Sequence, residues 1–344
     1  MGIEKLTKVL PKFTKMKELE LSGLSKNKLI KIFDPEKSIS KPAKARNKPK
    51  ISATKTLSPQ EQINMMVNSQ VKRTKGLLVE DFVAKKQKLI NELSKVCDKS
   101  VIARIEKADN PEQLAKILAE QEYMPIGKYA KYIIDGKFVK KSNPDQVVKP
   151  LSLEMEQIQY QQRIIKGNFT LAREKAMHVP SKNPKVIAIE NILKEQYGCK
   201  FVSLKDNEEL ARKVLKAYEI ATKNGVKTPK NVIASDFMVA EGENFFNGTI
   251  LLNRNQHTLC EGFMSTSSDF HVPLHEILHN THPKLVSFSW KKIPSELMGV
   301  KNELSIYSKN AQTHETFTEL NTKRLIEGLN PQEQALFDYL NIFA

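Results

Sequence analysis

Long apolar runs are missing from this sequence of 344 residues. No stretch approaches the roughly 20 apolar residues that a membrane-spanning helix needs, so we expect no membrane span. The first residues, MGIEKL, contain no apolar segment like that of a secretory signal peptide, and Leu6 stands where a myristoylation signal has Ser or Thr. These absences favour a cytoplasmic protein and leave export by a non-classical route open.

Cysteine is also scarce, and Cys97, Cys199 and Cys260 lie far apart in the sequence. An odd number of widely spaced cysteines is unlike the disulfide framework of a small secreted domain and is consistent with a reducing compartment. A cysteine hydrolase that pairs Cys260 with His257 is disfavoured, because neither a glycine-rich turn nor a clear helix start positions the thiol.

The formal net charge of +16 comes from the front of the chain. From Met1 to Ser100 there are 23 Lys and Arg against 10 Asp and Glu, a net charge of +13, whereas from Lys185 to Ala344 there are 18 against 19, a net charge of −1. Residues 1–60 are rich in Lys, Ser and Pro and cannot bury enough apolar surface to offset their ordering entropy, so we expect a disordered basic N-terminal region. Such a region suits an anionic partner, but it contains few of the aromatic side chains that stack on nucleic-acid bases.

Residues 61–183 have the apolar periodicity of helices. One predicted helix carries four apolar residues on one side: Leu78, Phe82, Leu89 and Leu93. Another begins at Pro111, and a long amphipathic helix covers about 151–177. Residues 129–139 are typical of a small hairpin. We interpret 61–183 as a mainly helical accessory region.

From residue 184 onward, helical patterns alternate with short strand patterns. We predict helices over 188–197 and 207–223, strands over 232–234 and 237–240, a turn and strand over 245–253, and an edge strand over 263–266. Two helices, a small sheet and then further helices predict an α+β domain over 184–344.

The most informative stretch is His275-Glu276-Ile277-Leu278-His279, which has the pattern H-E-x-x-H. Residues four apart share one face of a helix, so the two imidazoles can bind one divalent metal ion, and the adjacent Glu can act as general base on a metal-activated water. Cap-forming residue types at 267–269 and a proline at 283 predict the helix ends. The alternative is a histidine-rich helix with an exposed polar face, which the caps and the apolar flank of the helix disfavour.

A catalytic zinc site needs a third protein ligand. His282 and His271 share a face with the first histidine and are alternative ligands, but we expect them to line the cleft. Glu315 and Glu319 stack on one face of a second predicted helix, and a carboxylate from that helix completes a His₂Glu site. Glu319 is suited to accept a hydrogen bond from a metal-bound histidine, and His314 to donate one to a developing oxyanion. The alternative is a solvent-facing pair of glutamates.

The same residues carry a family resemblance. The order H-E-x-x-H at 275–279, S-x-Y at 305–307 and E-x-F-x-E at 315–319 resembles the zinc metallopeptidases called gluzincins. It is most similar to the branch that contains the anthrax lethal factor catalytic domain and many zincin-like domains of phages and toxins. Leu278 stands where that branch often has Gly, and Thr318 where it usually has Ala. The resemblance covers about 185–344.

The resemblance implies a zincin-like domain with a small sheet, an active-site helix and following helices, and one Zn²⁺ per chain. The implied roles are metal ligands for His275, His279 and Glu315, general base for Glu276, and hydrogen-bond donor to the oxyanion for Tyr307. We therefore expect a zinc metalloendopeptidase, whose peptide or protein substrate extends along the edge strand as an added strand. Two alternatives stay open: an inactive zincin-like interaction module, and a protein that binds nucleic acid or an anionic surface through its basic N-terminal region.

Overall fold

The computed structural model describes residues 59–123, 153–236, 240–256, 260–289 and 291–344. The predicted disordered region lies outside these ranges except for its last two residues, and so do the predicted hairpin at 129–139, His257 and most of the strand predicted at 237–240. None of the helices within these ranges is long and apolar enough to cross a membrane.

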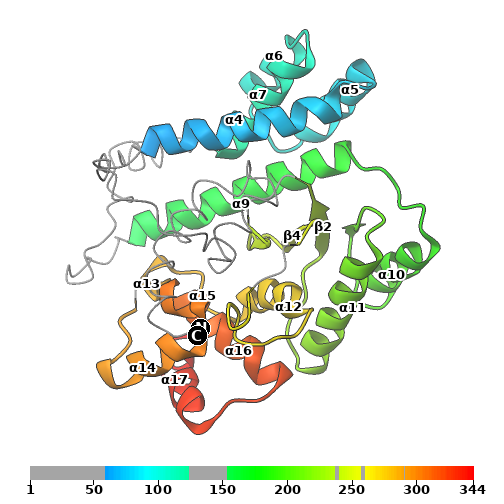
Figure 1. Ribbon diagram of the computed structural model, residues 1–344. Coiled ribbons are helices and arrows are strands. Elements are labelled where there is room, and N and C mark those ends of the chain that lie inside the picture. Colours follow the sequence, from blue (N-terminus) through cyan, green and yellow to red (C-terminus); the bar gives the residue numbers. More distant parts are fainter. Residues whose placement is uncertain (1–58, 124–152, 237–239, 257–259, 290) are drawn as a thin grey trace, which may run out of the picture.

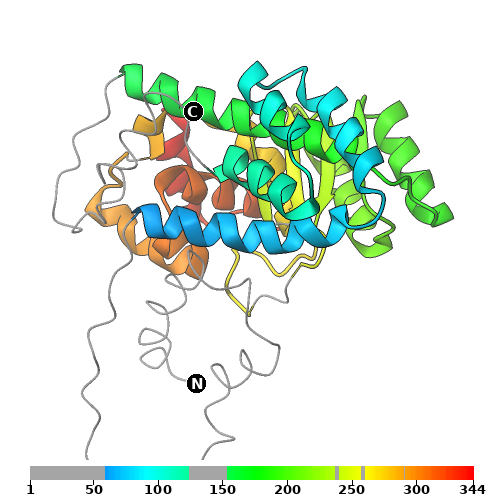
Figure 2. The same cartoon turned by 90° about the horizontal axis from the view of Figure 1, so that it is seen from above.

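The first helices of the described part share one apolar core. They are α4 (Pro59–Leu78), α5 (Phe82–Leu93), α6 (Lys99–Glu106), α7 (Pro111–Tyr123) and α9 (Leu153–Ala176). Figure 2 shows α7 between α4 and α9, and α7 contacts both helices. The helix predicted from Pro111 and the long helix predicted over 151–177 are thus confirmed as α7 and α9.

The single helix predicted from Leu78 to Leu93 is wrong, because two helices occupy this stretch. The chain turns at Asp81, whose φ of 60° lies in the left-handed region, and α5 begins at the next residue. Aspartate tolerates this conformation better than most residues. Leu78, Leu89 and Leu93 are nevertheless fully buried, so the apolar spacing identified the shared face correctly.

The next elements build a small mixed sheet. They are α10 (Pro184–Glu195), β1 (Phe201–Ser203), α11 (Glu208–Lys223), β2 (Asn231–Ser235), β3 (Gly242–Asn244) and β4 (Thr249–Asn253). The strand order is β1-β2-β4-β3, in which β1, β2 and β4 are parallel and β3 runs antiparallel to β4. The predicted helices over 188–197 and 207–223 and the strands at 232–234 and 245–253 are confirmed within a few residues. Together with the helices on both sides of the sheet, this confirms the α+β class.

The edge of the sheet differs from the prediction. Residues 263–266 form no strand, and the edge next to the metal-site helix is β3. The carbonyl oxygens of Gly262 and Phe263 instead accept the backbone N–H groups of Ile306 and Tyr307, both at 2.9 Å. A positive φ of 72° at Gly262 turns this segment away from the sheet. The sequence analysis missed β3 because Gly-Glu-Asn has low strand propensity.

The C-terminal part is helical. It consists of α12 (His271–Leu278), the 3₁₀ turn η2 (His279–Thr281), α13 (Val286–Ser289), α14 (Ser295–Leu304), α15 (Ile306–Asn310), α16 (Thr313–Ile326) and α17 (Pro331–Asn341). Figure 1 shows the layers from top to bottom: the N-terminal helices, α9, the sheet, and then α12 with α16 beside it. Contacts between α12 and α16 bring the two predicted site helices together.

Helix α9 covers the face of the sheet opposite α12. Leu171 packs against a small cluster of buried residues from three segments of the chain: Ile233, Phe245 and Leu251. Gly167 permits this close approach, because a Cβ at that position would lie 2.5 Å from the Cβ of Phe245. The helix predicted for the accessory region therefore completes the core of the sheet. The domain boundary at 183/184 itself stays a prediction.

We predict that residues 185–344, produced without α9, are far less stable than the full chain. Removing the helix exposes three large apolar side chains, each worth about 1.5–3 kcal/mol when buried. Their sum is comparable to the whole stability of an ordinary domain, about 5–15 kcal/mol. Thermal unfolding followed by circular dichroism checks this. An equal midpoint for the short segment and the full chain would contradict the role given to α9.

Candidate metal centre

Helix α12 is fixed by its apolar flank rather than by a capping side chain. Leu274, Ile277 and Leu278 are fully buried in the core shared with α11. The predicted caps at 267–269 do not form, since the N-cap is Phe270 and no side chain caps the helix. The buried flank holds the opposite face of α12, with His275 and His279, toward α16.

Helix α16 presents two carboxylates to α12. Glu315 and Glu319 lie one turn apart and both contact histidines of α12, as the sequence analysis expected. Phe317 and Leu320 are buried in the neighbouring apolar core and fix the rotation of the helix.

Three atoms of the predicted ligands converge on one point. The Nε2 of His275 lies 3.0 Å and the Nε2 of His279 lies 3.4 Å from Oε2 of Glu315. In a tetrahedral zinc site with metal–ligand distances near 2.1 Å, ligand atoms stand about 3.4 Å apart. The ligand atoms of His275, His279 and Glu315 all lie within 4.8 Å of one another, so these residues could hold a metal ion.

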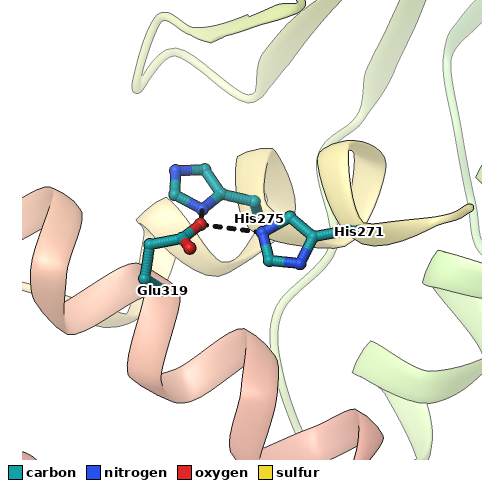
Figure 3. A group of neighbouring side chains, drawn as sticks. All are labelled: His271, His275 and Glu319. Atoms are coloured by element: carbon teal, nitrogen blue, oxygen red, sulfur yellow. Dashed lines mark hydrogen bonds and ion pairs between the residues drawn. The ribbon is translucent and has the colours of Figure 1, made fainter. Parts of the chain in front are cut away.

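A second histidine–glutamate group adjoins the first. Oε1 of Glu319 lies 2.7 Å from Nε2 of His271 and 3.0 Å from Nδ1 of His275, as Figure 3 shows. The backbone N–H of Ser265 (2.7 Å) and the hydroxyl of Ser305 (3.1 Å) donate to the other carboxylate oxygen. Glu319 is thus fully buried and satisfied by protein donors, so this group needs no metal ion. The contact with Glu319 orients His275 so that Nδ1 faces Glu319 and Nε2 faces Glu315. The Nδ1–H does not point straight at Oε1 of Glu319.

His279 is oriented by two consecutive hydrogen bonds, which run through His282 to a backbone carbonyl. The Nδ1 of His282 lies 2.8 Å from the carbonyl oxygen of Pro283, which can only accept, so this nitrogen carries a proton. Burial lowers the pKa of His282 to about 2, and its Nε2 therefore remains an acceptor for Nδ1–H of His279, 2.8 Å away. Burial also lowers the pKa of His279, to about 4. The partners thus assign His279 the tautomer whose Nε2 lone pair faces the metal position.

Glu315 is oriented from its other side. The Nε2 of His314 lies 3.1 Å from Oε1 of Glu315, which leaves Oε2 for the two metal-site histidines. Thr318, the residue that departs from the family pattern, lies 3.3 Å from Nδ1 of His279 and donates to the carbonyl oxygen of His314. Each of the three candidate ligands is therefore oriented by a contact with at least one further buried side chain.

The charge of Glu315 suits a metal ligand. Burial would raise the pKa of Glu315, but the neighbouring histidines His279, His275 and His314 outweigh burial and hold this pKa well below its usual range. Burial alone would lower the pKa of His275, but Glu315 and Glu319 outweigh it and raise that pKa to about 10. Without a metal ion, the position between His275 and Glu315 therefore holds a proton, which a metal ion would displace.

Tyr307 lies beside the three ligands. Its ring is 5.9 Å from that of His275 in an edge-to-face arrangement. Burial, followed by the neighbouring carboxylate of Glu315 with which its hydroxyl shares a hydrogen bond, keeps the pKa of Tyr307 well above its usual range. The hydroxyl therefore stays protonated and remains a hydrogen-bond donor at neutral pH.

Glu276 is almost buried, with 7% of its surface exposed, and edge strand β3 holds it in place. The side chain of Asn244 donates to the backbone carbonyl of Glu276 at 2.6 Å. Burial, with a contribution from the carboxylates of Glu315 and Glu243, raises the pKa of Glu276 to about 8. A carboxylate with a pKa near neutrality is suited to take up a proton and to release it again.

Gly242 and Asn244 are the site residues that the sequence analysis missed. A Cβ at Gly242 would lie 2.5 Å from Cγ of Glu276, a distance that real Cβ atoms do not reach. Glycine therefore allows the edge strand to approach the candidate base. A Gly two residues before an Asn, shortly before a strong strand, was visible in the sequence, but nothing there linked it to the H-E-x-x-H helix.

We predict that Gly242→Ala lowers the rate of the peptide hydrolysis proposed below about 100-fold, while the metal content stays at the level of the unmodified protein. The added methyl group must displace Glu276, and a shift of about 1 Å in a catalytic group costs up to about 100-fold in rate. Turnover and zinc content are measured on the same preparations. Gly299→Ala, in the middle of α14 with open space around it, is the matched control and should leave both unchanged. Equal activity of Gly242→Ala and Gly299→Ala would show that a methyl group at residue 242 does not displace Glu276.

Comparison of the chain with models of known families, with curated proteins and with solved structures gives no match.

Proposed function

We propose that the protein is a zinc-dependent metalloendopeptidase with a zincin-like domain of the gluzincin type. The observation that carries this proposal is the convergence of His275, His279 and Glu315 with Glu276 held beside them by an edge strand. A metal site that only braces a fold has no use for a buried carboxylate with a pKa of about 8 next to it.

Zn²⁺, when bound by the three ligands, supplies a Lewis acid that lowers the pKa of water and polarises a carbonyl group. Glu276 accepts a proton from the attacking water and returns it to the leaving amine. Tyr307, which stays protonated, donates a hydrogen bond to the developing oxyanion, an interaction typically worth about 3–4 kcal/mol for one well-placed donor.

Strand β3 offers a backbone to the substrate. Phe245 and Thr249, and likewise Glu241 and Asn253, are joined by ladder hydrogen bonds. Because such pairs alternate along an antiparallel ladder, the N–H and C=O groups of Gly242 and Asn244 point away from β4. An extended peptide bound there would form an added strand next to Glu276.

The full chain, loaded with zinc, tests the proposal with a mixture of peptides of varied sequence, whose products are identified by mass spectrometry. We expect about one zinc per chain, cleavage that a chelator abolishes and cleavage that added zinc restores. Zinc binding without cleavage of any peptide would favour the interaction module instead. A folded chain that binds no zinc would overturn both the enzyme and the metal site.

A further inference from the structure

The turn between β3 and β4 holds an aromatic residue in an unusual conformation. Phe246 has a φ of 59°, in the left-handed region that bulky residues rarely adopt. Its backbone N–H donates to Oδ1 of Asn244 at 2.8 Å, which stabilises the turn. Such outliers cluster at functional sites, and here the turn directly follows the strand beside Glu276.

In this conformation the ring of Phe246 contacts two cationic side chains from distant parts of the chain. The guanidinium carbon of Arg163, on α9, lies 5.2 Å from the ring centroid, and Nζ of Lys284, in the segment before α13, lies 5.8 Å away. Figure 1 shows the first half of α9 next to α13, and a hydrogen bond from Ser287 N–H to Glu156 (2.7 Å) joins them.

Neither cation has a carboxylate partner within the described part of the chain. The nearby acids are engaged elsewhere, because Glu243 pairs with Lys166 at 2.7 Å and Glu156 accepts from the backbone of α13. Arg163 and Lys284 are both exposed, and both lie within 6 Å of the centroid of the Phe246 ring. Two adjacent cations without a counter-ion form a site for an anionic group, and the planar guanidinium suits a carboxylate.

The cluster adjoins the candidate metal centre. The ring of Phe246 lies 6.0 Å from that of His282, whose Nε2 contacts His279. A peptide added along β3 would pass this cluster directly after Asn244.

We propose that Arg163 and Lys284, which both contact the Phe246 ring, form a subsite for an acidic side chain of the peptide that extends along β3. This inference rests on the proposed function, since it names the class of substrate for the same site. The protein would then prefer peptides that carry Asp or Glu a few residues from the cleaved bond.

The test compares three blocked peptides of one length, rich in Glu, Gln or Lys around a common centre. Their binding to the zinc-loaded Glu276→Gln protein is measured by fluorescence anisotropy, and their cleavage by the unmodified full chain by mass spectrometry. An exposed ion pair contributes a factor of about 1.5–5 to a binding constant. We therefore expect the Glu peptide to bind about tenfold more tightly than the Lys peptide, by a margin that shrinks as salt is added.

The variant Arg163→Glu with Lys284→Glu should reverse this order. Lys200→Glu with Lys223→Glu is the matched control, because it makes the same change of net charge at exposed positions beside β1 and at the end of α11. Equal binding of the three peptides, or a reversal by the control as well, would overturn the subsite. Preference for the Glu peptide that depends on Arg163 and Lys284, without any cleavage, would support the subsite and count against the peptidase.

Discussion

Replacing Glu276 with Gln should lower peptide hydrolysis by about 10²–10⁴-fold while leaving one zinc per chain, because the amide keeps the size of the side chain and cannot accept the proton. The side chain does not belong to the ligand set, it packs against Gly242, and Asn244 donates to the backbone carbonyl of Glu276, a bond that the substitution leaves in place. Loss of turnover with unchanged metal is therefore the signature of a base rather than of a ligand.

Glu261→Gln is the control for this substitution. Glu261 is an exposed carboxylate before Gly262, and its loss should leave both turnover and zinc content unchanged. Zinc content and the rate on one peptide are measured for the three proteins. Hydrolysis that survives in Glu276→Gln would show that another group takes the proton, and the proposed mechanism would be wrong.

The periodicity within each of two helices was sufficient to predict which side chains share a face at the centre of this site. His275 and His279 share a face because they are four residues apart, and Glu315 and Glu319 share a face for the same reason. The apolar residues between them are buried as their spacing predicted. Whether two side chains share a helix face depends on their spacing along the chain, and a single sequence gives that spacing.

The residues that support the candidate ligands depend instead on how separate segments of the chain pack together. His282 reaches His279 because the chain leaves α12 through a 3₁₀ turn, whereas an ideal helix would have put it on the face of His275. Strand β3 has three residues with little strand preference and exists because β4 pairs with it. The contact of α9 with the sheet joins residues about 80 positions apart, as between Asn168 and Asn247. Local patterns carry no information about such contacts.

Substituting the two histidines on either side of His275 should have very different effects on zinc affinity. His271 lies one turn before His275 and His279 one turn after it, and both are buried. In the proposed site His279 is a ligand, whereas His271 contacts Glu319 and would act on the ion only through that carboxylate and His275. Zinc sites with four ligands bind with about 10–16 kcal/mol, or roughly 2.5–4 kcal/mol per ligand.

His279→Ala should therefore weaken zinc binding by about two to three orders of magnitude. His271→Ala should weaken it by less than about tenfold, since even direct partners of a ligand are worth only about 10–100-fold. Competition with a chromophoric chelator gives both constants, and circular dichroism confirms that both variants are folded. The reverse ranking would move the ion to the group of His271, His275 and Glu319. That outcome would leave Glu315 without a metal to bind, so the peptidase proposal depends on the larger loss of zinc affinity in His279→Ala.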